Sequence, residues 1–253
     1  MSQGKRRKPQ KQNATSPFLK GAFVLVGVFL IVSACITGMR AITQLSPKEA
    51  PVPPIVQPQS TVDTTAWNLL LVNSTHAIPD GYSPELSVVD QRGAKFDVRA
   101  ADALKEMLSA AESAGLSPII CSSYRSSEKQ TQIFDRQVAS LREDGLSQAE
   151  ALEKAKTFTA YPGTSEHQLG LSADIVSLEY QNLDEKQAET PEQLWLMKHC
   201  AEFGFILRYP TGKSEITGVI FEPWHYRYVG SEAAQEIMSR GITLEEYLSD
   251  FGG

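Results

Sequence analysis

Four residues in two short stretches have the side-chain types of a hydrolytic metal site. His167 and Asp174 lie seven positions apart, and Glu222 lies three positions before His225. Catalytic zinc is commonly bound by three nitrogen or oxygen ligands that leave a fourth position for water, and a nearby carboxylate outside the ligand set can take a proton from that water. Two imidazoles, one carboxylate ligand and one spare carboxylate therefore predict a zinc hydrolase.

The sequence around these residues resembles that of a known enzyme family. Residues 165–174 (SEHQLGLSAD) and 222–225 (EPWH) resemble the S-x-H-x-x-G-x-A-x-D and E-x-W-H signatures of the VanY-type D-alanyl-D-alanine carboxypeptidases. These are zinc enzymes of bacterial cell-wall metabolism with a hedgehog/D,D-peptidase fold. The resemblance runs from about Trp67 to the C-terminus and includes SSYRS, YPGTS and FILRYPTGK. Two positions depart mildly, because Ser172 stands where alanine is usual and Ser123 where glycine is common.

The resemblance implies a role for each of the four residues. His167, Asp174 and His225 would bind Zn²⁺, and Glu222 would be the general base. Taken alone, each has an ordinary alternative: a surface loop histidine for His167, a cap or salt bridge for Asp174, and a buried pair with Arg227 for Glu222. Their combination at this spacing favours the metal site.

The same resemblance implies substrate-binding residues. A carboxypeptidase must bind a free carboxylate, and the planar guanidinium of Arg125 can do so with two hydrogen bonds. The alternative for Arg125 is a structural salt bridge. Ser165 would assist Arg125, and Trp224 and Tyr226 would either line the pocket or pack in the core. The role of Gln130, which also matches a family position, stays open.

Local sequence suggests how the chain positions these residues. Residues 170–177 alternate like a strand, which would put Asp174 on one face with Ser172. The Pro162-Gly163 pair predicts a turn before His167. Glu222 and His225 would point to opposite faces of a regular strand, so we expect Pro223 to mark a distortion that brings them together.

The remaining pattern alternates helix and strand and predicts an α+β domain with a small antiparallel sheet and packed helices. Helices are expected at 98–114, 127–141, 147–158 and 191–203, with Thr190 as a cap, and a last short helix follows the capping box Thr243-Leu-Glu-Glu246. Strands are expected at 117–122 and within 219–228. On the 191–203 helix, Leu194, Met197 and Cys200 or Ala201 would face inward. His76 and His199 match no motif and are interpreted as surface residues or residues outside the metal's ligand set.

The N-terminal region differs in composition from the rest. Residues 1–20 carry six basic side chains and no acid, and an uncharged apolar run follows in residues 21–39. At 1.5 Å per residue, about 18 residues nearly match a bilayer core of roughly 30 Å. We therefore expect a basic cytoplasmic tail (1–20), a transmembrane anchor (21–39), a proline-rich linker (40–61) and an extracytoplasmic domain (62–253).

A cleaved signal peptide is the alternative to an anchor. Val32-Ser-Ala-Cys35 resembles a lipobox, which would make Cys35 the acylated first residue of a lipoprotein. Both an anchor and a lipid place the domain at the outer face of the membrane. Of the other two cysteines, Cys121 follows an apolar run and is expected to be a buried free thiol, with a bridge to Cys200 as the alternative.

Charge excludes one class of partner. The net charge is −6, and it becomes −12 without the six basic residues of the tail, so we do not expect nucleic acid as a partner.

The resemblance implies a zinc D-alanyl-D-alanine carboxypeptidase that acts on peptidoglycan stem peptides, with no protein partner predicted. An L,D-carboxypeptidase of the same family is the nearest alternative, and a non-catalytic wall-binding module is a third.

Overall fold

The computed structural model describes residues 62–252. The predicted basic tail, membrane anchor, linker and lipobox cysteine lie outside the described residues. Within residues 62–252, no helix is both long and apolar enough to cross a bilayer.

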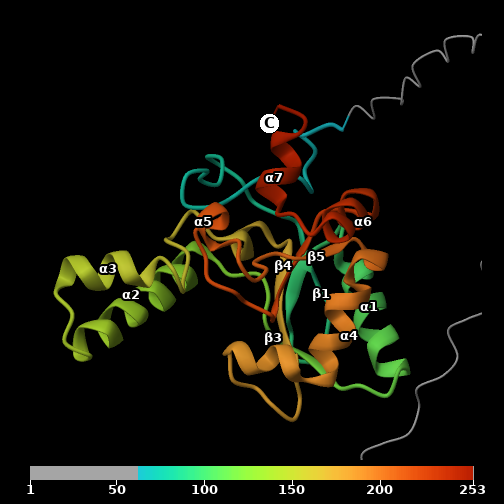
Figure 1. The fold of residues 1–253 in the computed structure, drawn as a ribbon, viewed down its shortest axis with the longest axis horizontal. Helices are drawn as coiled ribbons and strands as arrows, with labels where there is room; N and C mark the ends of the chain where they lie inside the picture. Colours follow the sequence, from blue (N-terminus) through green and yellow to red (C-terminus); the bar gives the residue numbers. More distant parts are fainter. Residues whose placement is uncertain (1–61, 253) are drawn as a thin grey trace, which may run out of the picture. The chain divides into compact units, whose positions relative to one another are not determined.

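A four-stranded antiparallel sheet forms the centre of the fold (Figure 1). Its strand order is β3 (Pro118–Ser122), β4 (Ser172–Ser177), β6 (His225–Tyr228) and β5 (Phe205–Leu207). All six residues of β4 are buried. A separate two-stranded hairpin joins β1 (Leu86–Val88) to β2 (Lys95–Asp97). Together with the helices, these sheets give the α+β architecture that the sequence predicts.

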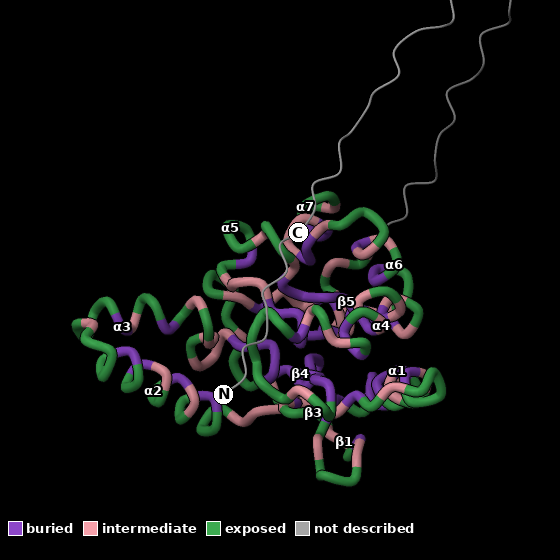
Figure 2. Tube along the Cα trace, turned by 60° about the horizontal axis from the view of Figure 1, so that its bottom comes forward, coloured by how far each residue is buried: buried purple, intermediate pink, exposed green. Residues whose placement is uncertain are grey.

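The two faces of the central sheet differ in polarity. Asp174 pairs directly with His225, and Ser172 with Arg227, so these four polar residues share one face. The opposite face is apolar and includes Ala173, Ile175 and Tyr226 from β4 and β6. Figure 2 shows the buried residues concentrated along β4 and β5. The polar face carries the predicted site residues, and the apolar face forms the main core.

Two helices pack on the apolar face. They are α1 (Ala101–Ser113), which contributes Leu104 and Met107, and α4 (Pro191–His199), which contributes Leu196. Thr190 caps α4 as predicted, because its side chain accepts a hydrogen bond from the backbone N–H of Gln193.

The predicted inner face of α4 is partly wrong. Leu194 is 57% exposed, whereas Gln193, Leu196 and Cys200 are buried. The Gln193 amide is buried because its oxygen accepts a hydrogen bond from the Tyr226 hydroxyl, and its nitrogen donates to the Ile175 carbonyl. A satisfied polar side chain thus takes the inward position, which an apolar pattern cannot reveal.

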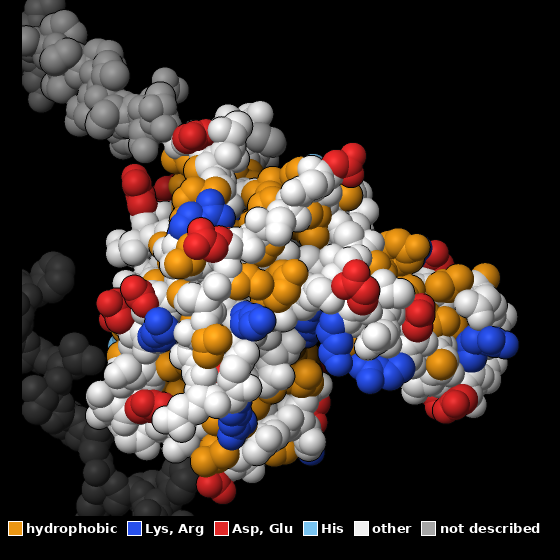
Figure 3. Space-filling model, turned by 180° about the vertical axis from the view of Figure 1, so that it is seen from behind, with side chains coloured by type: hydrophobic (Ala, Val, Ile, Leu, Met, Phe, Trp, Pro, Cys, Tyr) orange, Lys and Arg blue, Asp and Glu red, His pale blue; other side chains and the backbone are white. Residues whose placement is uncertain are grey.

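A helical hairpin projects from one side of the sheet (Figure 1). It consists of α2 (Ser127–Glu143) and α3 (Gln148–Ala155), which agree closely with the predicted helices. The hairpin has its own small core of Phe134, Val138, Leu141, Ala151 and Ala155. In the view from behind, acidic and basic side chains are interspersed over the domain and the hairpin (Figure 3).

The C-terminal part adds three helices: α5 (Ser214–Thr217), α6 (Ser231–Arg240) and α7 (Leu244–Ser249). The capping box before α7 is present as predicted, since Thr243 and Glu246 exchange side-chain and backbone hydrogen bonds. Helices α6 and α7 pack in a second cluster that includes Ile206 and Val229. The sequence pattern missed α6 and the short strands β1, β2 and β5.

A β-bulge in β3 corrects the prediction for Cys121. Ile120 pairs with Ile175 and Ser122 pairs with Asp174, so two steps along β3 match one step along β4. The extra residue is Cys121, which is exposed instead of buried, and the bulge turns Ser122 toward the polar face. Within the described part of the chain, Cys121 and Cys200 form no disulfide.

Candidate active site

His167 is positioned by a tight turn and a 3₁₀ turn. The Thr164 N–H donates to the Tyr161 carbonyl at 2.9 Å, and Gly163 has φ of +87°. Proline followed by glycine with positive φ is typical of a type II turn, as the sequence predicts. The chain then enters a 3₁₀ helix, Glu166–Leu169, which carries His167. The His167 ring is buried against the sheet.

Hydrogen bonding fixes which nitrogen His167 presents to the site. Its Nδ1 lies 2.8 Å from the Ser123 carbonyl oxygen, which can only accept a hydrogen bond. Nδ1 therefore carries the proton. The unprotonated Nε2 faces Asp174, 3.2 Å from its Oδ2. This is the tautomer that a metal ligand requires.

His225 faces the same carboxylate from the neighbouring strand. Its Nδ1 lies 3.1 Å from Asp174 Oδ1, and the two residues are direct cross-strand partners. Asp174 thus lies between the two imidazoles, with one oxygen toward each.

Glu222 reaches the site through a turn and not through a bulge. The His225 N–H donates to the Glu222 carbonyl at 3.2 Å, which closes a β-turn over Glu222-Pro-Trp-His225. Because this reverses the chain direction before β6 begins, Glu222 Oε2 lies 3.8 Å from His225 Nδ1. The prediction that both side chains reach one site is confirmed, and the physical reason is a turn with proline at its second position.

The three predicted ligands fit a tetrahedral metal. One ligand atom from each of His167, Asp174 and His225 lies within 4.8 Å of the others, and all three residues are buried. Zinc bonds of about 2.0–2.1 Å in a tetrahedron place neighbouring ligand atoms about 3.3 Å apart. Each imidazole nitrogen lies at about that distance from an Asp174 oxygen, His225 Nδ1 at 3.1 Å from Oδ1 and His167 Nε2 at 3.2 Å from Oδ2. The donor set of two imidazoles and one carboxylate suits zinc.

Burial and neighbouring charges shift the protonation of these groups. Burial, with the positive charge of Arg125, lowers the pKa of His167 to about 4, so this ring is neutral at pH 7. Burial would raise the pKa of Asp174, but the two histidines and Arg125 hold it well below its usual range. A neutral imidazole and an ionised carboxylate are the states that bind a metal.

The pKa values of Glu222 and His225 are both raised. Burial raises the pKa of Glu222 to about 8, and the nearby Asp174 charge adds to the effect. Burial opposes the charged form of His225, but its hydrogen bond to Asp174 and the nearby Glu166 carboxylate raise its pKa to about 9. Without metal, the site thus holds protons that a bound cation would displace.

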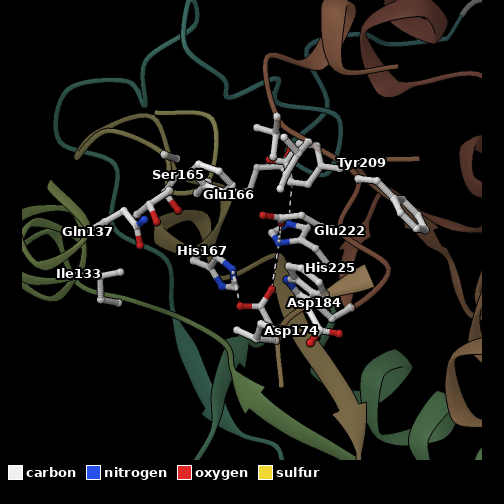
Figure 4. A pocket seen from close by; sticks show the side chains of 18 of the residues that line it. Ile133, Gln137, Ser165, Glu166, His167, Asp174, Asp184, Tyr209, Glu222 and His225 are labelled. Carbon is white, nitrogen blue, oxygen red and sulfur yellow. Dashed lines mark hydrogen bonds and ion pairs between the residues drawn. The ribbon is translucent and has the colours of Figure 1, made fainter. Parts of the chain in front are cut away.

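All of the predicted site residues line one cavity of about 530 Å³. Figure 4 shows His167, Asp174, Glu222 and His225 pointing toward one another in this cavity. The lining includes Arg125, Ser165, His167, Asp174, Glu222, Trp224 and His225. Ile133 and Gln137 from α2 form one wall, so the projecting hairpin contributes to the pocket. Tyr226 packs on the apolar face of the sheet instead.

Arg125 lies at the edge of the metal site and is firmly held. Its Nη2 donates to Asp174 Oδ2 at 2.7 Å, its Nε donates to Ser122 Oγ at 2.8 Å, and its Nη1 donates to Gln130 Oε1 at 3.3 Å. These contacts use three of its five N–H groups and leave one on each terminal nitrogen. The salt bridge that was the alternative role is therefore present, and it coexists with two free donors beside the cavity.

The structure also gives positions to residues that the sequence left open. Gln130 is fully buried and links Arg125 to the Ala160 carbonyl, so it orients the guanidinium. His76 is exposed and His199 stacks on Trp195, both without contact to the site, as expected.

Sequence reasoning missed Glu166 and Tyr209. Glu166 precedes His167 and is buried in ion pairs with Arg208 and Arg227. Burial opposes its ionisation, but the two guanidiniums hold its pKa well below the usual range. Tyr209 lines the cavity, with its ring centroid 4.8 Å from that of His225. No pattern in the sequence pairs Glu166 with two arginines some forty and sixty positions away.

The comparisons with known proteins agree with this geometry. Residues 93–231 match the family model of VanY, D-alanyl-D-alanine carboxypeptidase, over more than half of the chain. The chain belongs to the VanY family. A D-alanyl-D-alanine carboxypeptidase of Enterococcus faecalis is 45% identical over 188 residues, which are 74% of this chain and 68% of that protein.

Solved structures of similar proteins share the fold. VanYB in complex with D-alanine-D-alanine is 44% identical with a TM-score of 0.67, covering 73% of this chain and 98% of that one. A mutant of the D,D-pentapeptidase VanY with bound Zn(II) is also 44% identical, with a TM-score of 0.66, over 72% of this chain and 99% of that one. The LD-carboxypeptidase LdcB is 39% identical with a TM-score of 0.63, over 72% and 86% of the two chains.

Proposed function

We propose that this protein is a zinc-dependent D-alanyl-D-alanine carboxypeptidase that removes the terminal D-alanine from peptidoglycan stem peptides. The observation that carries the proposal is the convergence of the His167, Asp174 and His225 ligand atoms with Glu222 in a cavity that Arg125 also lines. VanY-family relatives with D-alanine-D-alanine and with Zn(II) support the substrate class and the metal.

Each residue has a distinct task in peptide hydrolysis. Bound zinc supplies a Lewis acid that polarises the peptide carbonyl and lowers the pKa of water toward about 7. His167, Asp174 and His225 would hold Zn²⁺. The single negative charge of Asp174 leaves the metal centre with a formal charge of +1, which would stabilise negative charge in the transition state. Glu222 accepts the proton of the attacking water and returns it to the leaving amine of D-alanine. Its position beside His225, in a buried cavity, suits both transfers.

Arg125 is proposed to bind the carboxylate of the terminal D-alanine. Its two unused N–H groups, one on each terminal nitrogen, match the two oxygens of a carboxylate. Gln130 and Ser122 restrain the guanidinium, so less conformational entropy is lost on binding. Ser165 and Trp224 are buried at the cavity wall, where they complete the pocket.

Mass spectrometry of reaction products tests the activity directly. The purified full-length protein, loaded with zinc, is incubated with a pentapeptide stem that ends in D-Ala-D-Ala. Loss of a single alanine is expected, and an unchanged pentapeptide in the presence of zinc would count against the proposal. The Glu222→Gln variant serves as the inactive control, and Glu153→Gln, exposed on α3 and outside the cavity lining, is the matched control that should stay active.

An L,D-carboxypeptidase is the second candidate, because the LD-carboxypeptidase LdcB has the same fold at 39% identity. Such an enzyme would cleave the tetrapeptide before its terminal D-alanine with the same ligands and the same base. Turnover of matched tetrapeptide and pentapeptide stems separates the two candidates. A non-catalytic wall-binding module is disfavoured by Glu222, since binding alone requires no base beside the metal.

We also propose that the domain acts outside the cytoplasmic membrane, tethered by the N-terminal region. The support is the sequence: six basic residues in 1–20 and an apolar run in 21–39. Cell fractionation should find the protein with the membrane, and external protease should digest the domain in protoplasts. If Cys35→Ala releases the protein or changes its processing, a lipid anchor replaces the transmembrane helix in this proposal.

A further inference from the structure

His225 has two ring nitrogens in very different surroundings. Nδ1 faces Asp174 and the cavity, whereas Nε2 points into the protein toward Glu166 Oε2, 3.5 Å away. Both Nε2 and Oε2 are fully buried, and neither has a hydrogen-bond partner among the described residues. Buried polar atoms without partners are rare because each one loses its hydrogen bonds to water. These two atoms can form a hydrogen bond with each other when Nε2 carries a proton.

The other side of Glu166 explains its orientation. Its Oε1 accepts hydrogen bonds from Arg208 Nε and Arg227 Nη1, each at 2.8 Å. Two guanidiniums thus anchor one oxygen and leave the other to face His225. Arg227, in β6, is fixed in turn by the carbonyls of Asn68 and Leu70, and Arg208 directly follows β5. The Glu166 carboxylate is therefore held through the ends of two strands of the central sheet.

A metal on Nδ1 decides the protonation of Nε2. An imidazole that binds a cation through one nitrogen carries its proton on the other, and that N–H requires an acceptor. Glu166 Oε2 is a charged acceptor already in place. His167, by contrast, donates its outer N–H to the neutral Ser123 carbonyl.

We propose that Glu166 is a positioning residue that holds His225 in its metal-binding tautomer and orientation through an Oε2–Nε2 hydrogen bond. The inference rests on the zinc site proposed above and adds a residue outside its ligand set. Glu166 does not touch the substrate; it acts through His225 by raising the basicity of the ring and by fixing its plane.

The chain offers a matched control for the charge of Glu166. Glu245 pairs with the same Arg208, through contacts of 2.8 Å to Nη1 and 2.6 Å to Nη2. Glu166, Arg208 and Arg227 are buried and, with the partly exposed Glu245, form one cluster without net charge. Replacing either glutamate by glutamine therefore leaves the same excess positive charge, but only Glu166 faces His225.

The Glu166→Gln variant places the wrong group against His225. The two arginines require an acceptor, so they hold the amide oxygen at the Oε1 position. The amide NH₂ then occupies the Oε2 position and opposes the Nε2–H of His225. Loss of such an outer partner typically costs about 10- to 100-fold in metal affinity.

Zinc affinity and a spectroscopic signature test the proposal without any substrate. Dissociation constants are measured by competition with a chelating dye for the full-length wild type, Glu166→Gln and Glu245→Gln. The proposal expects weaker zinc binding, by about 10- to 100-fold, in Glu166→Gln alone. The visible bands of the cobalt-substituted protein should also shift in that variant and stay unchanged in Glu245→Gln. Equal losses in both variants would mean that cluster charge and not the contact matters, and would overturn the proposal.

A second variant covers the case in which Glu166→Gln does not fold. Glu166→Asp keeps the charge of the cluster but shortens the side chain by one methylene, so its carboxylate cannot reach the arginines and His225 together. Weaker zinc binding with a shifted cobalt spectrum is expected, and wild-type values would overturn the proposal. Because these readouts need no turnover, an absence of peptidase activity would contradict the proposed function and leave this result intact.

Discussion

His167 and His225 meet edge to face, with ring centroids 4.9 Å apart and an angle of 89° between the ring planes, and they present different nitrogens to the shared carboxylate. His167 offers Nε2 and His225 offers Nδ1. The difference follows from their backbones, because one ring approaches from a 3₁₀ turn and the other from a strand directly opposite Asp174. The perpendicular arrangement lets both rings face one carboxylate, each at a different oxygen, without a steric clash.

Removal of the metal should destabilise the fold. A ligand that binds only the folded state at 100 times its dissociation constant adds about 2.7 kcal/mol to the free energy of unfolding. For a domain of this size, that corresponds to roughly 5–10 °C in melting temperature. Differential scanning fluorimetry with and without a chelator should show this loss and its reversal by zinc. The His225→Ala variant should show no response to zinc, and a wild type indifferent to the chelator would contradict the metal site.

Much of the fold was predictable because its signals are local. The capping residues Thr190 and Thr243 and the Pro162-Gly163 turn act within a few positions of the chain, and all three are present as predicted. Short strands such as β5 were missed, because three residues carry too little periodicity. The predicted burial of Cys121 was wrong because the β-bulge that exposes it depends on pairing with another strand.

The site likewise has residues that local sequence predicts and residues that only tertiary contacts reveal. The residue types and spacing of His167, Asp174, Glu222 and His225 predict a common site, and the structure brings them together. Their outer partners were not predictable. Glu166, in the 3₁₀ helix, meets Arg208 and Arg227 only through tertiary packing, so long-range contacts decide which charged residue is buried and which oxygen faces His225.

Glu222→Gln should separate metal binding from catalysis. The amide keeps the size of the side chain but cannot accept the proton of water, so turnover of the pentapeptide should fall by about 10²- to 10⁴-fold. Zinc content, measured by atomic absorption, should stay at the wild-type level because Glu222 lies outside the predicted ligand set. A variant that loses its zinc would make Glu222 a ligand, and one that keeps full turnover would exclude it as the base.

The Arg208–Glu245 pair should make stability sensitive to acid. Burial opposes the ionisation of Glu245, but Arg208 lowers its pKa below the usual value. A lowered carboxyl pKa stabilises the fold above the unfolded-state pKa of about 4.3, and this contribution is lost as the pH falls through the folded-state pKa. The free energy of unfolding, measured with urea at pH 7, should therefore be lower by roughly 3 kcal/mol in Glu245→Gln than in the wild type, as for a broken buried ion pair.

The difference in free energy of unfolding between wild type and Glu245→Gln should become smaller as the pH is lowered below about 4. The matched control is Glu236→Gln, which removes an exposed ion pair with Arg240 and should change stability little at any pH. A gap between wild type and Glu245→Gln that stays constant with pH would show that the charge of Glu245 is not what stabilises the fold.

Arg125→Lys should distinguish a carboxylate clamp from a purely structural salt bridge. Lysine keeps the charge near Asp174 but loses the planar pair of donors, at a cost of about 1.5–3 kcal/mol for a charge-assisted hydrogen bond. This corresponds to a fall of roughly tenfold to hundredfold in kcat/KM for the pentapeptide. Arg136→Lys, on the exposed side of α2, should leave kcat/KM unchanged.

A pentapeptide with an amidated C-terminus should be a poor substrate for the wild type, because the clamp has no carboxylate to bind. For the same reason, Arg125→Lys should lower kcat/KM for this amidated peptide only slightly further. Equal cleavage of the amide and the free acid by the wild type would show that Arg125 does not read a terminal carboxylate, and would favour an endopeptidase.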